Sequence, residues 1–325
     1  MPTLAARDHV SGGTMELFDD NFRAGLDGAW DVPPLQPVTV RTAAEGLTVT
    51  PADTDPLTGE PAFAPPAEGR GGGPGPGDHL AWVALARGPG GARGFEVPAD
   101  GTVECAATLS ARGLGGARHP FGAAVPDPDG DVRLATAALI TMDPLSHVVC
   151  DFLLTNTRVH ALYERVPFPG ERYAAFSYAV PVASRTPGAW HRLSVRYEAG
   201  GTRVVWRVEG VEVFRVDRPG LRPADRGGLL LDHGGEEGEP VRLGRMVPAL
   251  GLLTLLDGAG PDGRGLVRPA AGSGTWFDPR VGAPREQEFV GDDDLLKQSA
   301  WRPGAVLGAR RVTVRAEVDS GVRGS

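Results

Sequence analysis

The sequence predicts an all-β fold, a jelly-roll sandwich of two antiparallel sheets. Many short stretches alternate apolar and polar residues, as strands with one buried face do, and several, such as VTVRTA, are rich in β-branched residues. The 47 glycines and 30 prolines fall mostly between these stretches, where they predict turns. No long stretch has the periodicity of a helix. Without an internal repeat, many short strands favour a sandwich over a propeller or a solenoid.

The elements are expected in a regular succession along the chain. The first ordered unit is MELFDDNF, and residues 38–51 form two strands around a turn at Glu45 and Gly46. Further strands are expected at residues 79–86, 101–112, 133–142, 147–155, 158–166, 172–182, 191–199, 202–210, 211–217, 250–258 and 310–318. We therefore predict a disordered leader over residues 1–14 and a single domain over residues 15–320, with long loops at 68–78 and 257–275.

Composition excludes several classes of partner. The chain has 325 residues, enough to bury a sizeable core, and its formal charge of -8 argues against a nucleic-acid partner. No apolar run is long enough for a transmembrane helix or a secretory signal, so we expect no membrane partner and a cytoplasmic location. Cys105 and Cys150 fall inside expected strands, where we expect them to be buried, reduced and apolar in character.

We expect neither a cofactor nor a metal. The acidic run at residues 292–294 could supply oxygen ligands to calcium, but no spaced set of ligands accompanies it, which favours a solvated loop. The two cysteines lack the clustered partners of a zinc site, and no serine-hydrolase elbow or zincin motif is present.

Three local patterns resemble the concanavalin A-like lectin/glucanase sandwich, especially its laminarinase-type glycoside hydrolases. They are LFDDNFRAGLDGAW at 17–30, GTVECAATLSA at 101–111 and AWHRLSVRYEAGGTRVVWRVEGVEVFRVD at 189–217. In the last, Glu209 stands where the family has Asp before a glycine. The resemblance covers roughly residues 15–220 and implies a concave sheet with a substrate groove. The whole chain also resembles an uncharacterised family of actinomycete proteins.

The chain departs from these hydrolases at their catalytic strand. The family carries Glu-x-Asp-x-x-Glu there, whereas this chain reads HVVCDFLL from His147, and only Asp151 can be aligned with one of the three carboxylates. A retaining glycosidase needs two carboxyl groups about 5 Å apart. The glycosidase chemistry of the family therefore does not carry over.

The candidate site lies on the hairpin HVVCDFLLTNTRVHALYER. Alternation puts His147 and Asp151 on one face of the first strand, and Arg158, His160 and Glu164 on one face of the second. A turn at Thr155 and Asn156 would place Asp151 opposite His160 and His147 opposite Glu164, as two separate acid–imidazole pairs. A turn at Asn156 and Thr157 shifts the register by two and keeps the same face; a three-residue turn would break the pattern.

Three further residues are weaker candidates for binding a substrate. Glu104 is expected on a neighbouring strand, Arg158 lies beside the pairs, and Tyr173 could stack on a ligand, as could Phe176 and Tyr178. Each has an ordinary structural explanation, because solvated sheet faces often carry ion pairs and strand aromatics usually lie in a core. The whole polar set could likewise be a solvated sheet face.

The sequence leaves several functions open. The leading hypothesis is an enzyme that binds a small organic molecule in the concave groove and promotes a proton transfer, as in a cyclisation, isomerisation, elimination or hydrolysis; secondary metabolism is one setting for such an enzyme. Asp151 or His160 would be its base, and Glu164 or His147 its acid. The alternatives are a carbohydrate-binding, lectin-like protein or a glycoside hydrolase with a divergent site, and a purely structural sandwich. The oligomeric state is not predicted.

Overall fold

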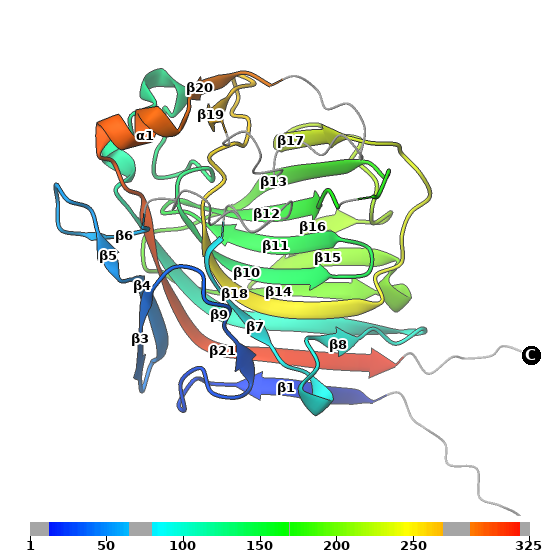
Figure 1. The fold of residues 1–325 in the computed structure, drawn as a ribbon. Coiled ribbons are helices and arrows are strands. Elements are labelled where there is room, and N and C mark those ends of the chain that lie inside the picture. The colour runs from blue at the N-terminus through cyan, green and yellow to red at the C-terminus, as the bar shows by residue number, and fades with distance from the viewer. Residues whose placement is uncertain (1–12, 65–79, 169, 269–286, 319–325) are drawn as a thin grey trace, which may run out of the picture.

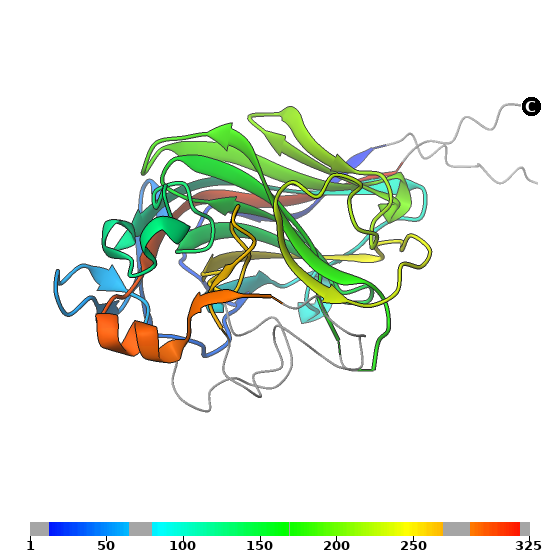
Figure 2. The ribbon, with the colours of Figure 1, turned by 90° about the horizontal axis from the view of Figure 1, so that it is seen from above.

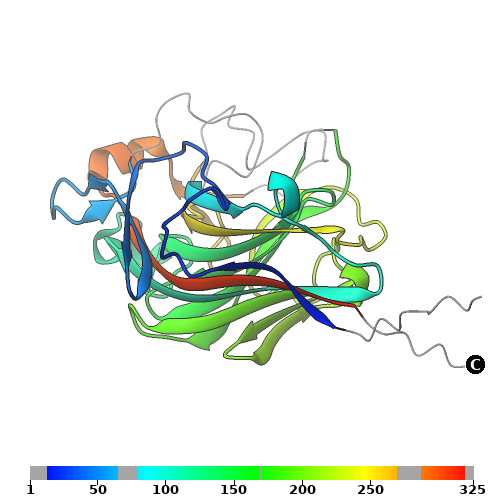
Figure 3. The same ribbon diagram turned by 90° about the horizontal axis from the view of Figure 1, so that it is seen from below.

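A computed structural model describes residues 13–64, 80–168, 170–268 and 287–318, and shows two antiparallel sheets packed face to face (Figures 1, 2 and 3). The eight-stranded sheet runs in spatial order through β16 (Val211–Val216), β15 (Arg203–Val208), β14 (Trp190–Glu198), β9 (Gly101–Leu114), β21 (Gly304–Val318), β4 (Gly46–Pro51) and β3 (Val38–Ala43), and β1 (Thr14–Asp20) also pairs with β21. The nine-stranded sheet runs through β17 (Leu229–Gly234), β13 (Ala175–Ser184), β12 (Arg158–Arg165), β11 (Val148–Leu154), β10 (Thr136–Asp143), β18 (Arg245–Leu253), β7 (Leu80–Ala86) and β2 (Trp30–Asp31), and β8 (Phe95–Glu96) also pairs with β18. The predicted all-β class and two-sheet sandwich are confirmed.

Smaller elements gather at one end of the sandwich. They are the antiparallel pair β5 (Asp53–Thr54) and β6 (Pro61–Ala62), the parallel pair β19 (Gly265–Val267) and β20 (Phe289–Gly291), and the helix α1 (Asp293–Ser299). A third apolar cluster at this end includes Phe121, Leu266 of β19 and Trp301, and Leu295 of α1 packs against it. Among the described residues, no helix has the length and apolar character needed to span a bilayer.

The main core fills the space between the two sheets. Alternate residues of β9, such as Cys105 and Leu109, point into it from one side, and Cys150 and Phe152 of β11 point into it from the other. Both cysteines are fully buried and free, as expected from their place in apolar strands. The opposite face of β11 and β12 therefore points away from the main core.

Several expected boundaries need correction. Strand β1 begins at Thr14, where it pairs with Glu317, so the last residue of the expected leader belongs to the sheet. The expected loop at 257–275 contains β19, while the loop at 68–78 lies outside the described residues. The expected acidic loop at 292–294 begins a helix, because the Asp292 side chain accepts from the backbone N–H groups of Asp294 and Leu295 as an N-cap.

Arg185, directly after β13, connects the tip of the β11–β12 hairpin to the other sheet. Its guanidinium is buried and donates to the carbonyl oxygens of Thr155 and, at 2.9 Å, Ala111 of β9. A third bond reaches the carbonyl oxygen of Ala189 at 3.3 Å. Backbone acceptors at both sheets therefore share one buried cation.

Replacing Arg185 with Met is expected to lower the free energy of unfolding by about 3 kcal/mol, because three carbonyl groups lose a charged donor in a buried place. Urea denaturation measures the change. As a control, Arg203→Met removes an exposed arginine that pairs with the exposed Asp217 and should cost less than about 1 kcal/mol. Equal losses in the two variants would contradict the assigned role.

Candidate functional site

The β11–β12 hairpin has the second of the predicted registers. The backbone N–H of Thr155 donates to the carbonyl oxygen of Arg158 at 3.0 Å, so Asn156 and Thr157 form the turn. The direct pairs expected from a turn at Thr155 and Asn156 are therefore wrong. The cause is Asn156, whose side-chain amide exchanges two hydrogen bonds with the backbone of Gly113 at the end of β9.

The observed register makes a zigzag of polar and apolar residues along the hairpin. Each acid or imidazole lies opposite an apolar side chain, and the next polar residue is its diagonal neighbour, at a distance of about 7–8 Å between Cα atoms. The cross-strand pairs are Asp151 with Leu162, Glu164 with Val149, and His160 with Leu153. Asp151 is thus the diagonal neighbour of both His160 and Glu164, so the two separate units expected from the sequence become one cluster.

This face of the hairpin is buried, although it points away from the main core. Asp151 and His160 are each 4% exposed, which excludes a solvated sheet face for these two residues. The surrounding side chains form a second apolar cluster, which includes Leu162 of the hairpin and, from outside the strands, Val132 and Leu255. The segments that carry Val132 and Leu255 meet where the Leu255 N–H donates to the carbonyl oxygen of Arg133.

The backbone around Asp151 departs from regular strand pairing. The Thr141 N–H of β10 donates to the Asp151 carboxyl group at 2.9 Å, while the Thr141 hydroxyl donates to the carbonyl oxygen of Cys150. The carbonyl oxygen of Asp151 accepts at 2.9 Å from the indole N–H of Trp206 in the other sheet. Side chains thus replace ladder bonds here, and they fix the position of the Asp151 carboxyl group.

The environment of Asp151 favours its neutral form. Burial is the largest effect and raises the pKa of Asp151 well above its usual range; the hydrogen bond from Thr141 opposes the rise, and the charge of Glu164 adds to it. Asp151 is therefore a carboxyl group that holds its proton to a higher pH than an exposed aspartate does, beside a second carboxyl group.

Glu164 is half-buried and contacts β13. The Ser177 hydroxyl donates to Oε1 of Glu164 at 2.5 Å, and the two residues face each other in the β12–β13 ladder. Ser177 itself is buried. We refer to Asp151, His160, Glu164 and Ser177 as the acid–imidazole cluster.

His160 supplies a neutral imidazole to this cluster. Burial lowers the pKa of His160 to about 4; the Arg158 cation adds to the decrease and Asp131 opposes it. Nδ1 of His160 is buried and has no hydrogen-bond partner among the described residues. Such an orphaned polar atom is rare in a folded protein, and one explanation is a ligand that supplies the partner.

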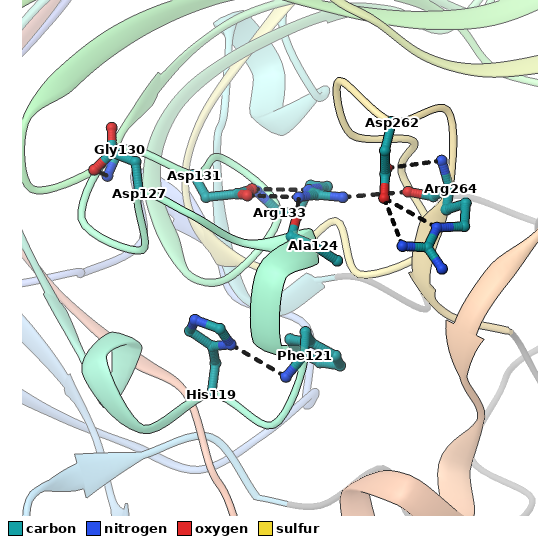
Figure 4. A network of polar contacts seen from close by, with 9 residues as sticks. All are labelled: His119, Phe121, Ala124, Asp127, Gly130, Asp131, Arg133, Asp262 and Arg264. Carbon is teal, nitrogen blue, oxygen red and sulfur yellow. Dashed lines mark hydrogen bonds and ion pairs between the residues drawn. The ribbon is translucent and has the colours of Figure 1, made fainter.

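The segment beside His160 is held by a buried arginine. Arg133 is 1% exposed and makes two bonds to the Asp131 carboxylate, and it also donates to the carbonyl oxygens of Ala124 and Arg264 (Figure 4). All three guanidinium nitrogens of Arg133 thus have hydrogen-bond acceptors within the protein. Arg133 therefore positions the segment that carries Asp131 and Val132.

His147 lies outside the cluster. It occupies the β10–β11 turn with a φ of 59°, and its ring stacks on Phe168 with centroids 4.2 Å apart. The Tyr173 hydroxyl donates to the carbonyl oxygen of Val166 at 2.7 Å and lies 2.8 Å from Nδ1 of His147. Since the phenol has one hydrogen, Nδ1 of His147 donates to Tyr173. The expected pair of His147 with Glu164 is absent, because Tyr173 and Phe168 hold this ring at the turn.

Glu104 is placed differently from the expectation. It belongs to β9 in the eight-stranded sheet, points away from the main core, and forms an ion pair with Arg196 at 3.5 Å. Glu104 and the cluster thus lie on opposite sides of the sandwich, and the expectation that Glu104 lies nearby is wrong. Arg158 is exposed and pairs with Asp127, so its cation acts on His160 at a distance.

Two residues of this face were not predicted. Ser177 lies between Phe176 and Tyr178, both in the main core, so strict alternation along the expected strand could have assigned it to the other face. His233 is buried and follows Leu231 of the second apolar cluster by two residues on β17. The stretch LLLDHG begins with three leucines, which could have predicted a strand with His233 near its end. Among the described residues, no group of three or more His, Cys, Asp or Glu could hold a metal ion.

The fold and this cluster define a class: a two-sheet β-sandwich protein with a buried acid–imidazole cluster on the outer face of one sheet. The chain belongs to DUF6081, a family of unknown function, whose pattern matches residues 16–318. An uncharacterized protein of Acanthamoeba polyphaga mimivirus is 29% identical over 204 residues, which cover 43% of this chain and 46% of that protein. The match thus spans about half the length of this curated relative.

Solved structures share the general sandwich at low identity. The Crh5 transglycosylase in complex with NAG is 14% identical, with a TM-score of 0.41 over 94% of this chain and 84% of its own. SCLam, a non-specific endo-β-1,3(4)-glucanase of family GH16, is 12% identical, with a TM-score of 0.43 over 93% of this chain and 91% of its own. The β-glucanase of Bacillus licheniformis is 9% identical, with a TM-score of 0.41 over 94% of this chain and 99% of its own. These likenesses concern the fold and assign no substrate or residue role to this chain.

Proposed function

We propose that this protein is an enzyme that binds a small organic molecule at the acid–imidazole cluster and moves a proton to and from it. The observation that carries the proposal is the position of Asp151, which is buried and has a raised pKa, beside a second carboxyl group, Glu164, on one face of the hairpin. A buried carboxyl group with a raised pKa beside another carboxyl group is a common arrangement for an acid and a base that act together.

The roles follow from the protonation states. Burial favours the neutral form of Asp151, so Asp151 is the general acid and Glu164 is the general base. This reverses the roles expected from the sequence. In one turnover Glu164 takes a proton from the substrate and Asp151 gives one, so Glu164 ends neutral and Asp151 ionised. Exchange with solvent then restores both. Cyclisation, isomerisation, elimination and hydrolysis can all use such a pair.

The surroundings indicate the kind of substrate. Val149, Leu153 and Leu162 alternate with the polar residues, so a bound molecule would contact mostly apolar side chains. Nδ1 of His160 would supply one hydrogen bond to a hydroxyl or carbonyl group. The substrate that fits best is compact, largely apolar and uncharged, with few polar groups.

The aromatic residues expected to bind a sugar in the carbohydrate-binding alternative are not placed to do so. Phe176 and Tyr178 are fully buried in the main core, and Tyr173 is bonded to His147 and Val166. Sugar rings usually need aromatic faces that are exposed along a groove, which these three residues do not offer.

The proposal can be tested without knowledge of the substrate. The protein is incubated with metabolite extracts, and untargeted mass spectrometry follows compounds that disappear or appear against a heat-inactivated control. Glu104→Gln, on the far side of the sandwich, should behave as wild type. A compound converted by wild type and by Glu104→Gln supports an enzyme. Retention of a compound without conversion, across extracts from several sources, would instead indicate a binding protein.

A further inference from the structure

The outer face of the eight-stranded sheet carries arginines of two kinds. In one half, every arginine forms an ion pair with a carboxylate: Arg196, Arg203, Arg207, Arg215 and Arg315. In the other half, four exposed arginines form no ion pair with any described residue: Arg41, Arg112, Arg192 and Arg310. This contrast within one face of a chain with a formal charge of -8 is not explained by the fold.

The four arginines lie in or beside one continuous row of side chains across five strands. In register, the row consists of Trp190, Ser110, Gly308, Thr48 and Arg41, from β14 through β9, β21 and β4 to β3. Arg112 lies two residues beyond Ser110 on β9, and Arg192 two residues beyond Trp190 on β14. Because neighbouring strands lie about 4.8 Å apart, the row spans roughly 19 Å. We call this row with its four arginines the basic patch.

A β-bulge places the fourth arginine. The β9–β21 register shifts between Ala309 and Arg311, so Arg310 is the extra residue and both arginines follow one another on the outer face. Arg311 pairs with Asp19, whereas the Arg310 guanidinium stacks on the Trp190 ring at 4.0 Å. Bulges often re-aim a side chain beside a functional site.

Two further contacts shape the basic patch. A Cβ atom at Gly308 would lie 2.9 Å from the Trp190 ring, so glycine is what lets this ring reach across the sheet. The carboxylate of Glu209 accepts a hydrogen bond from the backbone N–H of Arg192. The guanidinium group of Arg192 forms no ion pair with Glu209. The basic patch therefore combines four exposed cations with the exposed Thr48 hydroxyl group on a sheet face.

We propose that the basic patch binds an anionic polysaccharide, one whose sugar units carry carboxylate or sulfate groups. Guanidinium groups bind such oxyanions through paired hydrogen bonds, and the exposed hydroxyl group of Thr48 suits a ligand rich in hydroxyls. Single-stranded nucleic acid fits less well, because Arg310 covers the ring of Trp190 on which a base would stack. This site lies on the opposite side of the sandwich from the acid–imidazole cluster and is independent of the proposed enzymatic function.

Affinity electrophoresis in native gels tests the proposal with defined polymers: polygalacturonate, dextran sulfate, neutral dextran, and a single-stranded oligothymidylate. The test variant is Arg41→Ser/Arg192→Ser/Arg310→Ser. The matched control is Arg203→Ser/Arg207→Ser/Arg215→Ser, which removes the same charge from the paired half of the same face. Circular dichroism melting curves confirm that both variants fold.

Wild type and the control should be retarded by at least one anionic polysaccharide and not by neutral dextran. The test variant should bind at least about tenfold more weakly, since it loses three charge-assisted donors. Three results would overturn the proposal: no retardation of wild type by either anionic polysaccharide, an equal loss in the two triple variants, or retardation by the oligothymidylate alone.

Discussion

Glu164→Gln and Asp151→Asn are each expected to lower turnover of an identified substrate by about 10²- to 10⁴-fold, the usual contribution of one general acid or base. Gln keeps an oxygen that can accept from the Ser177 hydroxyl, and Asn keeps an acceptor for the Thr141 N–H. The packing of the face should therefore survive, and the melting temperature should stay within a few degrees of wild type.

Steady-state kinetics of both variants, with Glu104→Gln as the control, measures this effect. The pH profile of kcat adds a second readout. Asp151→Asn should abolish the decrease of rate on the alkaline side, where wild-type Asp151 loses its proton. If both variants keep at least a tenth of the wild-type rate, Asp151 and Glu164 do not carry the reaction.

The second large effect concerns acid stability and His160. The pKa of this imidazole is lowered from 6.5 to about 4 by burial, so below pH 6.5 the unfolded chain binds a proton that the folded protein does not. His160 therefore contributes its full stability above pH 6.5 and loses it as the pH falls to about 4. The loss amounts to about 3 kcal/mol.

The variant His160→Asn cannot take up this proton, so its stability relative to wild type should rise as the pH falls. Urea denaturation of both proteins at pH 8, 6.5, 5.5 and 4.5 gives the difference directly, and other titrating groups cancel between the two curves. Asp151 acts in the opposite sense: its raised pKa favours the folded protein at low pH, and this contribution decreases as the pH rises above 3.8. A difference between wild type and His160→Asn that is constant over this range would exclude a buried neutral His160.

Local patterns in the sequence predicted most of the strands, although the expected strand at 250–258 is wrong in its bounds, because β18 spans Arg245–Leu253. Alternation is a property of each strand alone, so Asp151 and His160 could be assigned to one face before any contact was known. The register depended on distant residues instead. Asn156 bonds to Gly113 on a strand of the other sheet, and no property of the hairpin alone contains this contact.

The wrong placement of Glu104 has a similar cause. Strand β9 has the alternation expected of either sheet, and the sheet to which it belongs is set by its pairing with β14 and β21. The burial of the cluster could not be predicted from the sequence either, because Val132 and Leu255 join its apolar surroundings from outside the strands. Burial is the main cause of the raised pKa of Asp151.

Strand β21 has a consequence for how this chain is synthesised and folded. It lies between β9 and β4 in the eight-stranded sheet and also pairs with β1 (Figure 1). The last strand described thus holds three other strands of that sheet together. Partners so distant in sequence make folding slow, since long loops must close before the contacts form. The nascent chain therefore leaves the β21-facing edges of β9 and β4 unpaired until β21 has left the ribosome, and during translation those edges are open to aggregation.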